Sequence, residues 1–148
     1  MSEFRKLSET VWASPQISEQ DVAEAAANGF SMVINNRPDG EDMGQPEGDV
    51  IAAAATAQGM EYRAIPIDHT GFGEAQVAAM SDALGAAGEG GKVLAYCRSG
   101  TRSTFLWALA QASAGEEPDA IATAAMAAGY DITPVRQALD MLAARASG

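Results

Sequence analysis

Tyr96-Cys97-Arg98-Ser99-Gly100-Thr101-Arg102-Ser103 is the stretch that decides the fold, and it contains the only cysteine of the 148-residue chain. The apolar run at 92–96 is short enough to be a buried strand, and the run at 104–110 predicts a helix. Backbone N–H groups at a helix N-terminus lack intrahelical partners, and with the helix dipole they favour a negative charge. The stretch therefore predicts an anion-binding loop between a strand and a helix, with the Cys97 thiolate at its base.

The other side chains of this loop suit the same task. Arg98 and Arg102 flank Gly100, whose missing Cβ lets the backbone curl with its amides inward. Arg102 offers a planar fork that can hold two oxygens of a tetrahedral anion. The candidate substrate-binding groups are Arg98, Ser99, Gly100, Thr101 and Ser103. A strand-ending buried cysteine beside surface arginines is the structural alternative, and it explains the combination less well.

Composition indicates one acidic domain that spans 1–148. The formal net charge is -11, with Lys+Arg 9 against Asp+Glu 20, which argues against nucleic acid and anionic membranes as partners. Two of the nine cations nevertheless lie in the cysteine loop, so a small anionic substrate is expected. A single cysteine forms no intramolecular disulfide, and no apolar run has the length of a signal peptide or a membrane span. We expect a soluble cytoplasmic protein.

No cofactor or metal is predicted. One cysteine and one histidine are too few for a usual zinc site. The sequence also contains no Walker-type or dinucleotide-binding glycine motif. The predicted chemistry therefore depends on side chains and backbone groups of the chain itself.

Strand and helix patterns alternate along the chain. Strands are expected at 10–13, 30–34, 60–67 and 92–96, and helices at 18–28, 49–58, 74–87, 104–110, 118–128 and from 133 onward. In the first of these helices Ser18 is the expected N-cap, with Asp21 three residues on. In the last, Thr133 is the expected N-cap and Pro134 the first helical residue. This alternation predicts an α/β fold with a mostly parallel central sheet flanked by helices.

Loops that follow parallel strands meet at one rim of the sheet. The loops that begin at Asn35, Asp68 and Cys97 should share that rim. The residues most able to reach Cys97 are then Arg37, Asp39, Asp68 and His69. Proximity alone makes these four side chains candidates for the site.

Asp68 is the best candidate for a general acid, and a turn or helix-capping aspartate explains it at least as well. Arg37 is a candidate for substrate binding. The acidic residues that follow it in the same loop are expected to be solvated: Glu41, Asp42, Glu47 and Asp49.

The cysteine loop resembles the active-site loop of rhodanese-type sulfurtransferases, in which a persulfide-carrying cysteine is followed five positions later by an arginine, as Arg102 follows Cys97. The protein-tyrosine-phosphatase signature has one more residue between the two. In that register Ser103 stands in the place of the arginine, and Tyr96 stands where a histidine normally precedes the cysteine. Both departures count against ordinary phosphatase chemistry.

The rest of the chain resembles the phosphatase-like domain of beta-lactamase-hydrolase-like proteins. The segments that carry the resemblance are 13–17, 33–41 and 94–103, and the similarity covers roughly 4–114. The resemblance implies a dual-specificity-phosphatase-like fold of the cysteine phosphatase superfamily and a sulfur transferase or phosphatase-like activity. In some members the domain is joined to a metallo-beta-lactamase-like sulfur dioxygenase, which implies such an enzyme as a partner in the same pathway.

Three functions follow from these residues. In the first, a sulfurtransferase, the Cys97 thiolate attacks the outer sulfur of thiosulfate or a persulfide, sulfite or a thiol leaves, and Arg98 and Arg102 hold the anion. The alternative is a tyrosine- or dual-specificity-like phosphatase that forms phosphocysteine at Cys97, with Asp68 as acid. A further alternative is a non-enzymatic sensor that binds sulfane sulfur or an oxyanion through Cys97.

Overall fold

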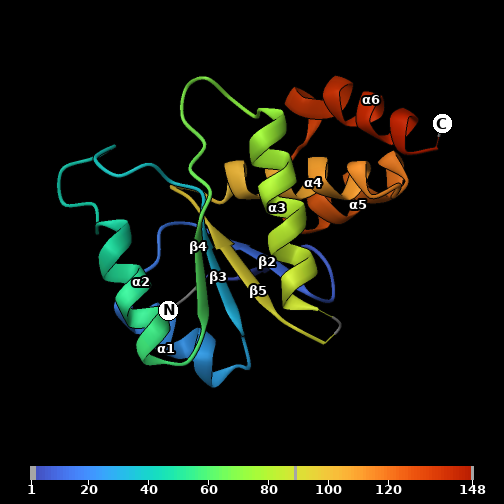
Figure 1. Ribbon diagram of the computed structural model, residues 1–148. Coiled ribbons are helices and arrows are strands. Elements are labelled where there is room, and N and C mark those ends of the chain that lie inside the picture. Colours follow the sequence, from blue (N-terminus) through green and yellow to red (C-terminus); the bar gives the residue numbers. More distant parts are fainter. Residues whose placement is uncertain (1–2, 89, 148) are drawn as a thin grey trace.

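The computed structural model describes residues 3–88 and 90–147 and contains a five-stranded sheet (Figure 1). The strands are β1 Arg5–Lys6, β2 Val11–Ser14, β3 Met32–Asn35, β4 Glu61–Ala64 and β5 Val93–Tyr96. Their spatial order is β1-β2-β5-β3-β4, and only β1 runs antiparallel to its neighbour. The predicted α/β class with a mostly parallel sheet is confirmed. β1 was not predicted, because two exposed basic residues carry no strand pattern.

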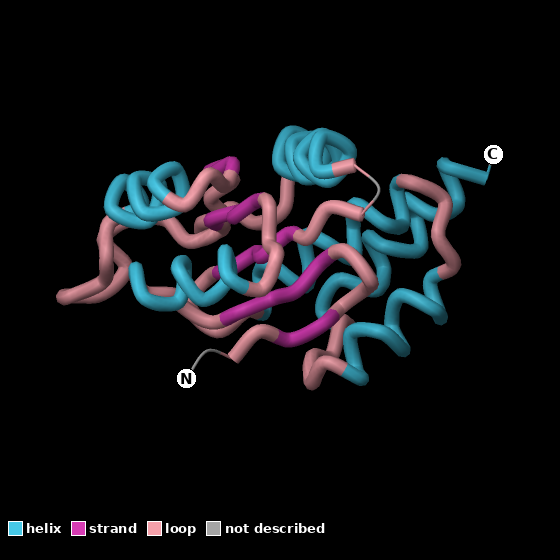
Figure 2. The backbone as a smooth tube through the Cα atoms, turned by 90° about the horizontal axis from the view of Figure 1, so that it is seen from below, coloured by secondary structure: helices cyan, strands magenta, loops and turns pink. Residues whose placement is uncertain are grey.

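Helices cover both faces of the sheet (Figure 2). They are α1 Glu19–Ala27, α2 Gly48–Ala57, α3 Glu74–Ala87, α4 Thr101–Ser113, α5 Pro118–Ala127, the 3₁₀ turn η1 Thr133–Val135, and α6 Arg136–Ser147. In Figure 1, α1 and α2 lie on one side of the strands, and α3 to α6 lie on the other.

Strand side chains alternate between two apolar cores, as the pleat requires. Ile34 and Ala95 belong to the larger core, which includes residues of α3, α4, α5 and α6. Val33 and Leu94 belong to the smaller core, which includes residues of α1 and α2. The central strands β3 and β5 are thus buried on both faces. Their carboxyl ends are fixed at one rim, where the polar loops begin.

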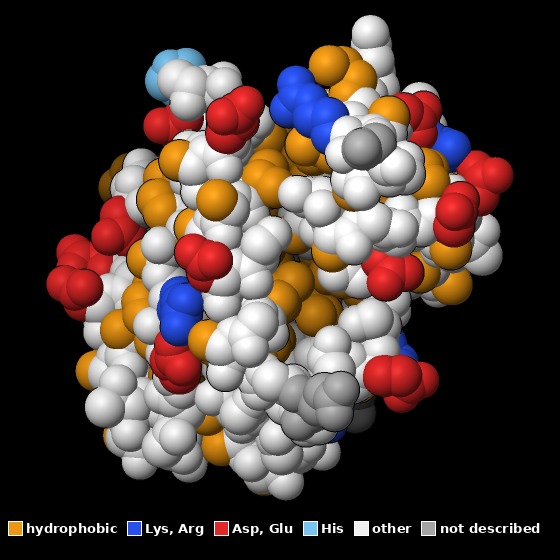
Figure 3. Space-filling model, turned by 45° about the vertical axis from the view of Figure 1, so that its right-hand side comes forward, with side chains coloured by type: hydrophobic (Ala, Val, Ile, Leu, Met, Phe, Trp, Pro, Cys, Tyr) orange, Lys and Arg blue, Asp and Glu red, His pale blue; other side chains and the backbone are white. Residues whose placement is uncertain are grey.

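Local sequence signals explain where the helices start. Ser18 and Asp21 form the reciprocal hydrogen bonds of a capping box at the start of α1, as the sequence predicts. α4 is buried almost all round. Acidic side chains are spread over the molecular face in Figure 3 and are not gathered in one patch. No helix in the described part of the chain is both long and apolar enough for a membrane span.

The start of the last helix was predicted wrongly. Asp131 accepts hydrogen bonds from the backbone N–H of Thr133, at 3.0 Å, and from its hydroxyl, at 2.6 Å. This local turn uses the Thr133 hydroxyl, so Thr133 does not cap an α-helix. Residues 133–135 form a 3₁₀ turn, and α6 begins only at Arg136.

Candidate active site

Cys97 lies between β5 and α4, at the carboxyl end of the sheet. Its backbone N–H donates to the Ser14 carbonyl at 3.3 Å, and the residue is fully buried. The Gly100 N–H points back at the Cys97 sulfur, with an N–Sγ distance of 3.1 Å. Gly100 has φ +92° and serves as the N-cap of α4, a left-handed conformation that favours glycine. The loop thus curls around the sulfur in the predicted manner.

The first turn of α4 supplies further donors. Thr104 N–H makes the first intrahelical bond, to the Gly100 carbonyl at 3.0 Å. Within 3–88 and 90–147, the backbone N–H groups of Arg102 and Ser103 have no hydrogen-bond acceptor. Such unpaired groups at a helix start attract an anion. They provide a cradle beside Cys97.

The Arg102 guanidinium is held at one end and open at the other. Its Nη1 and Nη2 donate to the two carboxylate oxygens of Glu41, each at 2.8 Å, and Nη1 also donates to the Ile67 carbonyl at 2.9 Å. The Nε atom makes no hydrogen bond to Glu41 or Ile67, and this side of the guanidinium can offer its own pair of N–H donors to an anion. The Glu41 hydrogen bond, opposed by burial, raises the pKa of Arg102, and Cys97 adds to this rise as a charge and a hydrogen-bond partner. Arg102 therefore lies next to the thiol with one fork available.

Glu41 and Asp42 are exposed, as the sequence predicts, but they are also components of the site, which the sequence did not indicate. Glu41 also accepts from Arg37 Nε at 2.9 Å, while Asp42 accepts from Arg37 Nη2 at 2.7 Å and pairs with Arg98 Nε at 3.4 Å. Two carboxylates therefore join three arginines, which come from the loop after β3, the loop after β5 and the first turn of α4. These hydrogen bonds fix the orientation of the Arg37 and Arg102 guanidinium groups.

The Arg102 hydrogen bond, opposed by burial and aided by Arg37, lowers the pKa of Glu41. Because the folded-state pKa lies below the ordinary value, this carboxylate stabilises the fold at neutral pH, and the contribution is lost as pH falls through the lowered pKa. Glu41→Gln is expected to lower the thermal midpoint at pH 7 by a few degrees, since a partly exposed pair contributes about 1 kcal/mol or less. Thermal unfolding followed by circular dichroism across pH 3–7 measures this.

The difference between wild type and Glu41→Gln should shrink as the pH falls through the lowered pKa of Glu41, where this carboxylate takes up a proton. Glu47→Gln is the matched control, because this exposed neighbour has no ion pair within the described residues. A difference that stays constant from pH 7 to pH 3 would contradict the role of Glu41 as an ionised partner of Arg102.

Other predicted site residues lie close by with different partners. Arg37 is 5% exposed, and its remaining donor, Nη1, donates to Gln16 at 3.0 Å. Its bond to Glu41 therefore comes from a buried side chain that is itself held in place. Ser103 is fully buried, and its hydroxyl donates to the side-chain oxygen of Asn36 at 2.8 Å, inside the fold. Asp39 accepts from the Gly48 N–H at the start of α2, at 2.8 Å.

The hydroxyls of Ser99 and Thr101 lie on the exposed outer side of the loop. They are hydrogen-bonded to each other at 2.9 Å. The Arg98 side chain is 67% exposed. These groups can turn toward a substrate without breaking any buried contact.

Asp68 begins the next loop of the rim. The preceding carbonyl, that of Ile67, receives Arg102, which ties this loop to the site. The Asp68 carboxylate is exposed and accepts from the Thr70 N–H at 2.9 Å and from the Thr70 hydroxyl. These bonds lower the pKa of Asp68, so it is ionised at neutral pH. The structure shows the turn arrangement that the sequence left open.

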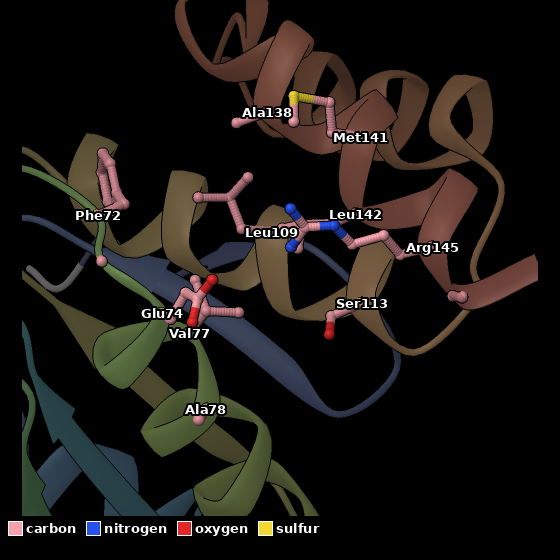
Figure 4. A pocket seen from close by; sticks show the side chains of 12 residues that line it. Phe72, Glu74, Val77, Ala78, Leu109, Ser113, Ala138, Met141, Leu142 and Arg145 are labelled. Atoms are coloured by element: carbon pink, nitrogen blue, oxygen red, sulfur yellow. The ribbon is translucent and has the colours of Figure 1, made fainter. Parts of the chain in front are cut away.

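Two cavities lie near these loops. A cavity of about 340 Å³ is lined by Arg37, Asp39 and Asp68 together with Tyr62, which confirms that the first two polar loops share a rim. A larger cavity of about 540 Å³ lies between α3, α4 and α6 (Figure 4), and no residue of 97–102 lines it. The anion cradle at Cys97 is separate from this apolar cavity.

Comparison with known proteins agrees with the geometry. The sequence profile of a family described as beta-lactamase hydrolase-like protein, phosphatase-like domain, matches residues 3–114. Beta-lactamase hydrolase-like proteins of Xylella fastidiosa Temecula1 and Agrobacterium fabrum C58 are 34% and 38% identical over 127 and 106 residues, which cover 85% and 72% of this chain. These segments make up only 29% and 24% of the two relatives.

Solved structures show the same fold. A Neisseria meningitidis Z2491 protein described provisionally as a phosphatase is 31% identical, with a TM-score of 0.81 and coverage of 95% of this chain and 98% of that one. A Shewanella putrefaciens CN-32 protein with a similar provisional description is 25% identical, with a TM-score of 0.76 and coverage of 97% and 92%. Pseudomonas aeruginosa TpbA with phosphotyrosine, at 18% identity, a TM-score of 0.68 and coverage of 99% and 91%, shares the fold.

The fold, the cysteine loop and the relatives lead to one assignment. The family profile covers the sheet, the loop at Cys97 and the whole of α4. Structural neighbours are phosphatases with the same arrangement of sheet and helices. The chain belongs to the beta-lactamase hydrolase-like family, whose phosphatase-like domain it contains.

Proposed function

We propose that this chain is a cysteine phosphatase that hydrolyses phosphate monoesters through a phosphocysteine at Cys97. The observation that carries the proposal is the open fork of Arg102 next to the thiol, with unpaired N–H groups from the start of α4. These donors suit the oxygens of a transferring phosphoryl group. The phosphatase neighbours support this reading, and they do not support the sulfur-transfer reading that the loop length favours.

The reaction divides into two displacements. The Cys97 thiolate attacks phosphorus, a sulfur–phosphorus bond forms, the ester oxygen–phosphorus bond breaks, and the alcohol leaves with a proton. Water then attacks the phosphocysteine, and inorganic phosphate leaves as the thiolate is regenerated. Arg102 and the α4 N–H groups hold the non-bridging oxygens in both steps. Glu41 keeps the Arg102 plane fixed throughout.

The first displacement depends on the leaving group. An alkoxide needs a proton from an acid, whereas a nitrophenolate leaves readily without one. Asp68 is ionised and bonded to Thr70, so it serves as an acid only after its loop releases Thr70. Esters of acidic phenols are therefore the preferred substrates.

Asp68→Asn tests this role of Asp68. We expect hydrolysis of p-nitrophenyl phosphate to change by less than about threefold, and hydrolysis of phenyl phosphate to fall about 10- to 100-fold, because only the second leaving group needs the acid. Phosphate release at a series of pH values measures both. Asp82→Asn, an exposed aspartate on α3, is the control. Equal losses on the two esters would show that Asp68 is not the acid.

Sulfur transfer remains a second candidate because Arg102 follows Cys97 by five positions. The deciding experiment gives the purified chain either p-nitrophenyl phosphate or thiosulfate, and follows phosphate release and intact-protein mass. Turnover of the ester with transient phosphocysteine supports the phosphatase. A stable gain of one sulfur atom that passes to cyanide, with no ester turnover, overturns it in favour of sulfur transfer. Modification without any turnover favours the sensor.

A further inference from the structure

Tyr130 contacts the cysteine loop from a distant part of the chain. It lies between α5 and η1, is 7% exposed, and belongs to the larger core. Its hydroxyl donates to the carbonyl of Ser99 at 3.1 Å. The Arg5 guanidinium covers the ring at 5.4 Å from its centre and donates to the Ala128 carbonyl at 3.2 Å. Contacts outside the cysteine loop therefore hold the Tyr130 side chain in position.

One peptide unit connects Tyr130 to the nucleophile. The Ser99 carbonyl and the Gly100 N–H belong to the same trans peptide, so they point in opposite directions. The carbonyl receives the Tyr130 hydroxyl, and the N–H points at the Cys97 sulfur at 3.1 Å. Whatever fixes the carbonyl therefore also aims the N–H at the sulfur.

The backbone of the loop does not fix this orientation by itself. Rotating the peptide by half a turn would move Gly100 from φ +92° to the negative side, and glycine adopts both regions with similar ease. After such a rotation the Ser99 carbonyl oxygen would face the thiolate in place of the N–H, and the two negative groups would repel each other. A contact outside the loop is needed to select one orientation.

We infer that Tyr130 is a positioning residue that holds the Ser99–Gly100 peptide so that its N–H donates to Cys97. Tyr130 lies beyond residue 114, outside the residues that the family profile matches. The inference rests on the proposed function only in taking Cys97 as the reactive thiol. Its readout is the reactivity of that thiol, which does not require phosphate ester turnover.

The surroundings keep Tyr130 in the donor form. Burial, with a smaller contribution from the Cys97 charge and against the effect of Arg5, raises the pKa of Tyr130. The hydroxyl therefore remains protonated through the neutral range. It also fills the space beside Gly100, since a Cβ there would overlap the Tyr130 oxygen. Tyr130 thus contacts the loop both through a hydrogen bond to Ser99 and through close packing against Gly100.

Tyr130→Phe tests the inference because it removes the hydroxyl and leaves the ring in the core. The rate of Cys97 alkylation by iodoacetamide is measured from pH 5 to pH 10. We expect its midpoint to rise by about 0.5–1 pH unit, and the rate at neutral pH to fall about 3- to 10-fold, which corresponds to the loss of one hydrogen bond. Arg102, the other charged group beside Cys97, is unchanged in this variant.

Tyr62→Phe is the matched control. Its hydroxyl accepts a hydrogen bond from Asn35 at 3.0 Å, and among the described residues it makes none to 97–102. The alkylation midpoint should match wild type in this variant. Incorporating p-aminophenylalanine at position 130 restores an N–H donor and should restore the midpoint. An unchanged midpoint in folded Tyr130→Phe, an equal shift in Tyr62→Phe, or no rescue by the amino analogue overturns the inference.

Gly100→Ala keeps the inference testable if Tyr130→Phe does not fold, as judged by thermal unfolding. The added methyl group collides with the Tyr130 hydroxyl and disfavours the positive φ. The peptide should then rotate, and the alkylation midpoint should rise by about as much as in Tyr130→Phe. A folded Gly100→Ala variant with a wild-type midpoint would exclude control of the thiol by this peptide. If the alkylation midpoints shift as expected but the wild-type chain hydrolyses no phosphate ester, the proposed function is wrong and the inference about Tyr130 still holds.

Discussion

Replacing Cys97 by serine is expected to abolish hydrolysis of p-nitrophenyl phosphate, with kcat lowered by at least about 10⁴-fold. A serine hydroxyl is not ionised at neutral pH, and the loop offers it no base: the Gly100 N–H and the Arg102 guanidinium next to Cys97 are both donors. Release of p-nitrophenol measures the loss.

The anion cradle should survive this substitution. Its donors are backbone groups of α4 and the fork of Arg102, and none of them belongs to the Cys97 side chain. Calorimetric titration with inorganic phosphate should therefore give a Kd within a few-fold of wild type, and thermal unfolding should be nearly unchanged. More than a tenth of wild-type turnover in Cys97→Ser would show that the ester is hydrolysed without this nucleophile.

Arg102→Lys is expected to lower kcat/KM for the same ester by about 10³-fold, although the positive charge is kept. Arginine binds Glu41 with one end and still offers the Nε side to a phosphoryl group. An ammonium group has one nitrogen and cannot occupy both places. We expect Glu41 to attract the ammonium, so the phosphoryl oxygens lose their directed donors.

Arg136→Lys is the matched control for this charge-conserving change. Arg136 lies on α6 and also binds two carboxylates, those of Asp119 and Asp140 at 2.7 and 2.9 Å, away from the cysteine loop. Its replacement should leave kcat/KM within about twofold, since exposed pairs contribute little. If Arg102→Lys kept more than a tenth of wild-type kcat/KM, charge and not fork geometry would be the requirement.

Features coded by neighbouring residues were predicted well from the sequence. The capping box at Ser18 and Asp21 uses residues three positions apart, and the cysteine loop is one continuous stretch between an apolar strand and an apolar helix. Because parallel strands deliver their loops to one rim, the nearness of Arg37 and Asp68 also followed from the alternation of elements.

Features that depend on distant partners were missed. Glu41 resembles any acidic loop residue until the fold brings Arg102, 61 positions later, against it. Tyr130 lies 31 positions from Ser99 and has no motif of its own. No local pattern in the sequence signals either contact, since each is created by the packing of elements that are far apart in the chain.

The functional prediction was also partly successful: the family was predicted correctly, whereas the preferred reaction was not supported. The family and a cysteine-based site came from combined motifs, and the family and fold are confirmed. The preference for sulfur transfer came from one residue of loop length between Cys97 and Arg102. The phosphatase neighbours now favour the alternative, because a scaffold of this kind constrains more of the chain than one spacing does.

The network of Glu41 and Asp42 with the three arginines gives the site a nearly balanced charge. When Cys97 is ionised, three negative groups face Arg37, Arg98 and Arg102. Little net attraction then remains for chloride and other simple anions of the surrounding solution, which bind through charge alone. For the phosphatase that we propose, we expect selectivity to depend instead on the directions of the N–H donors, so that a tetrahedral oxyanion competes successfully in a salt-rich medium where a spherical ion does not.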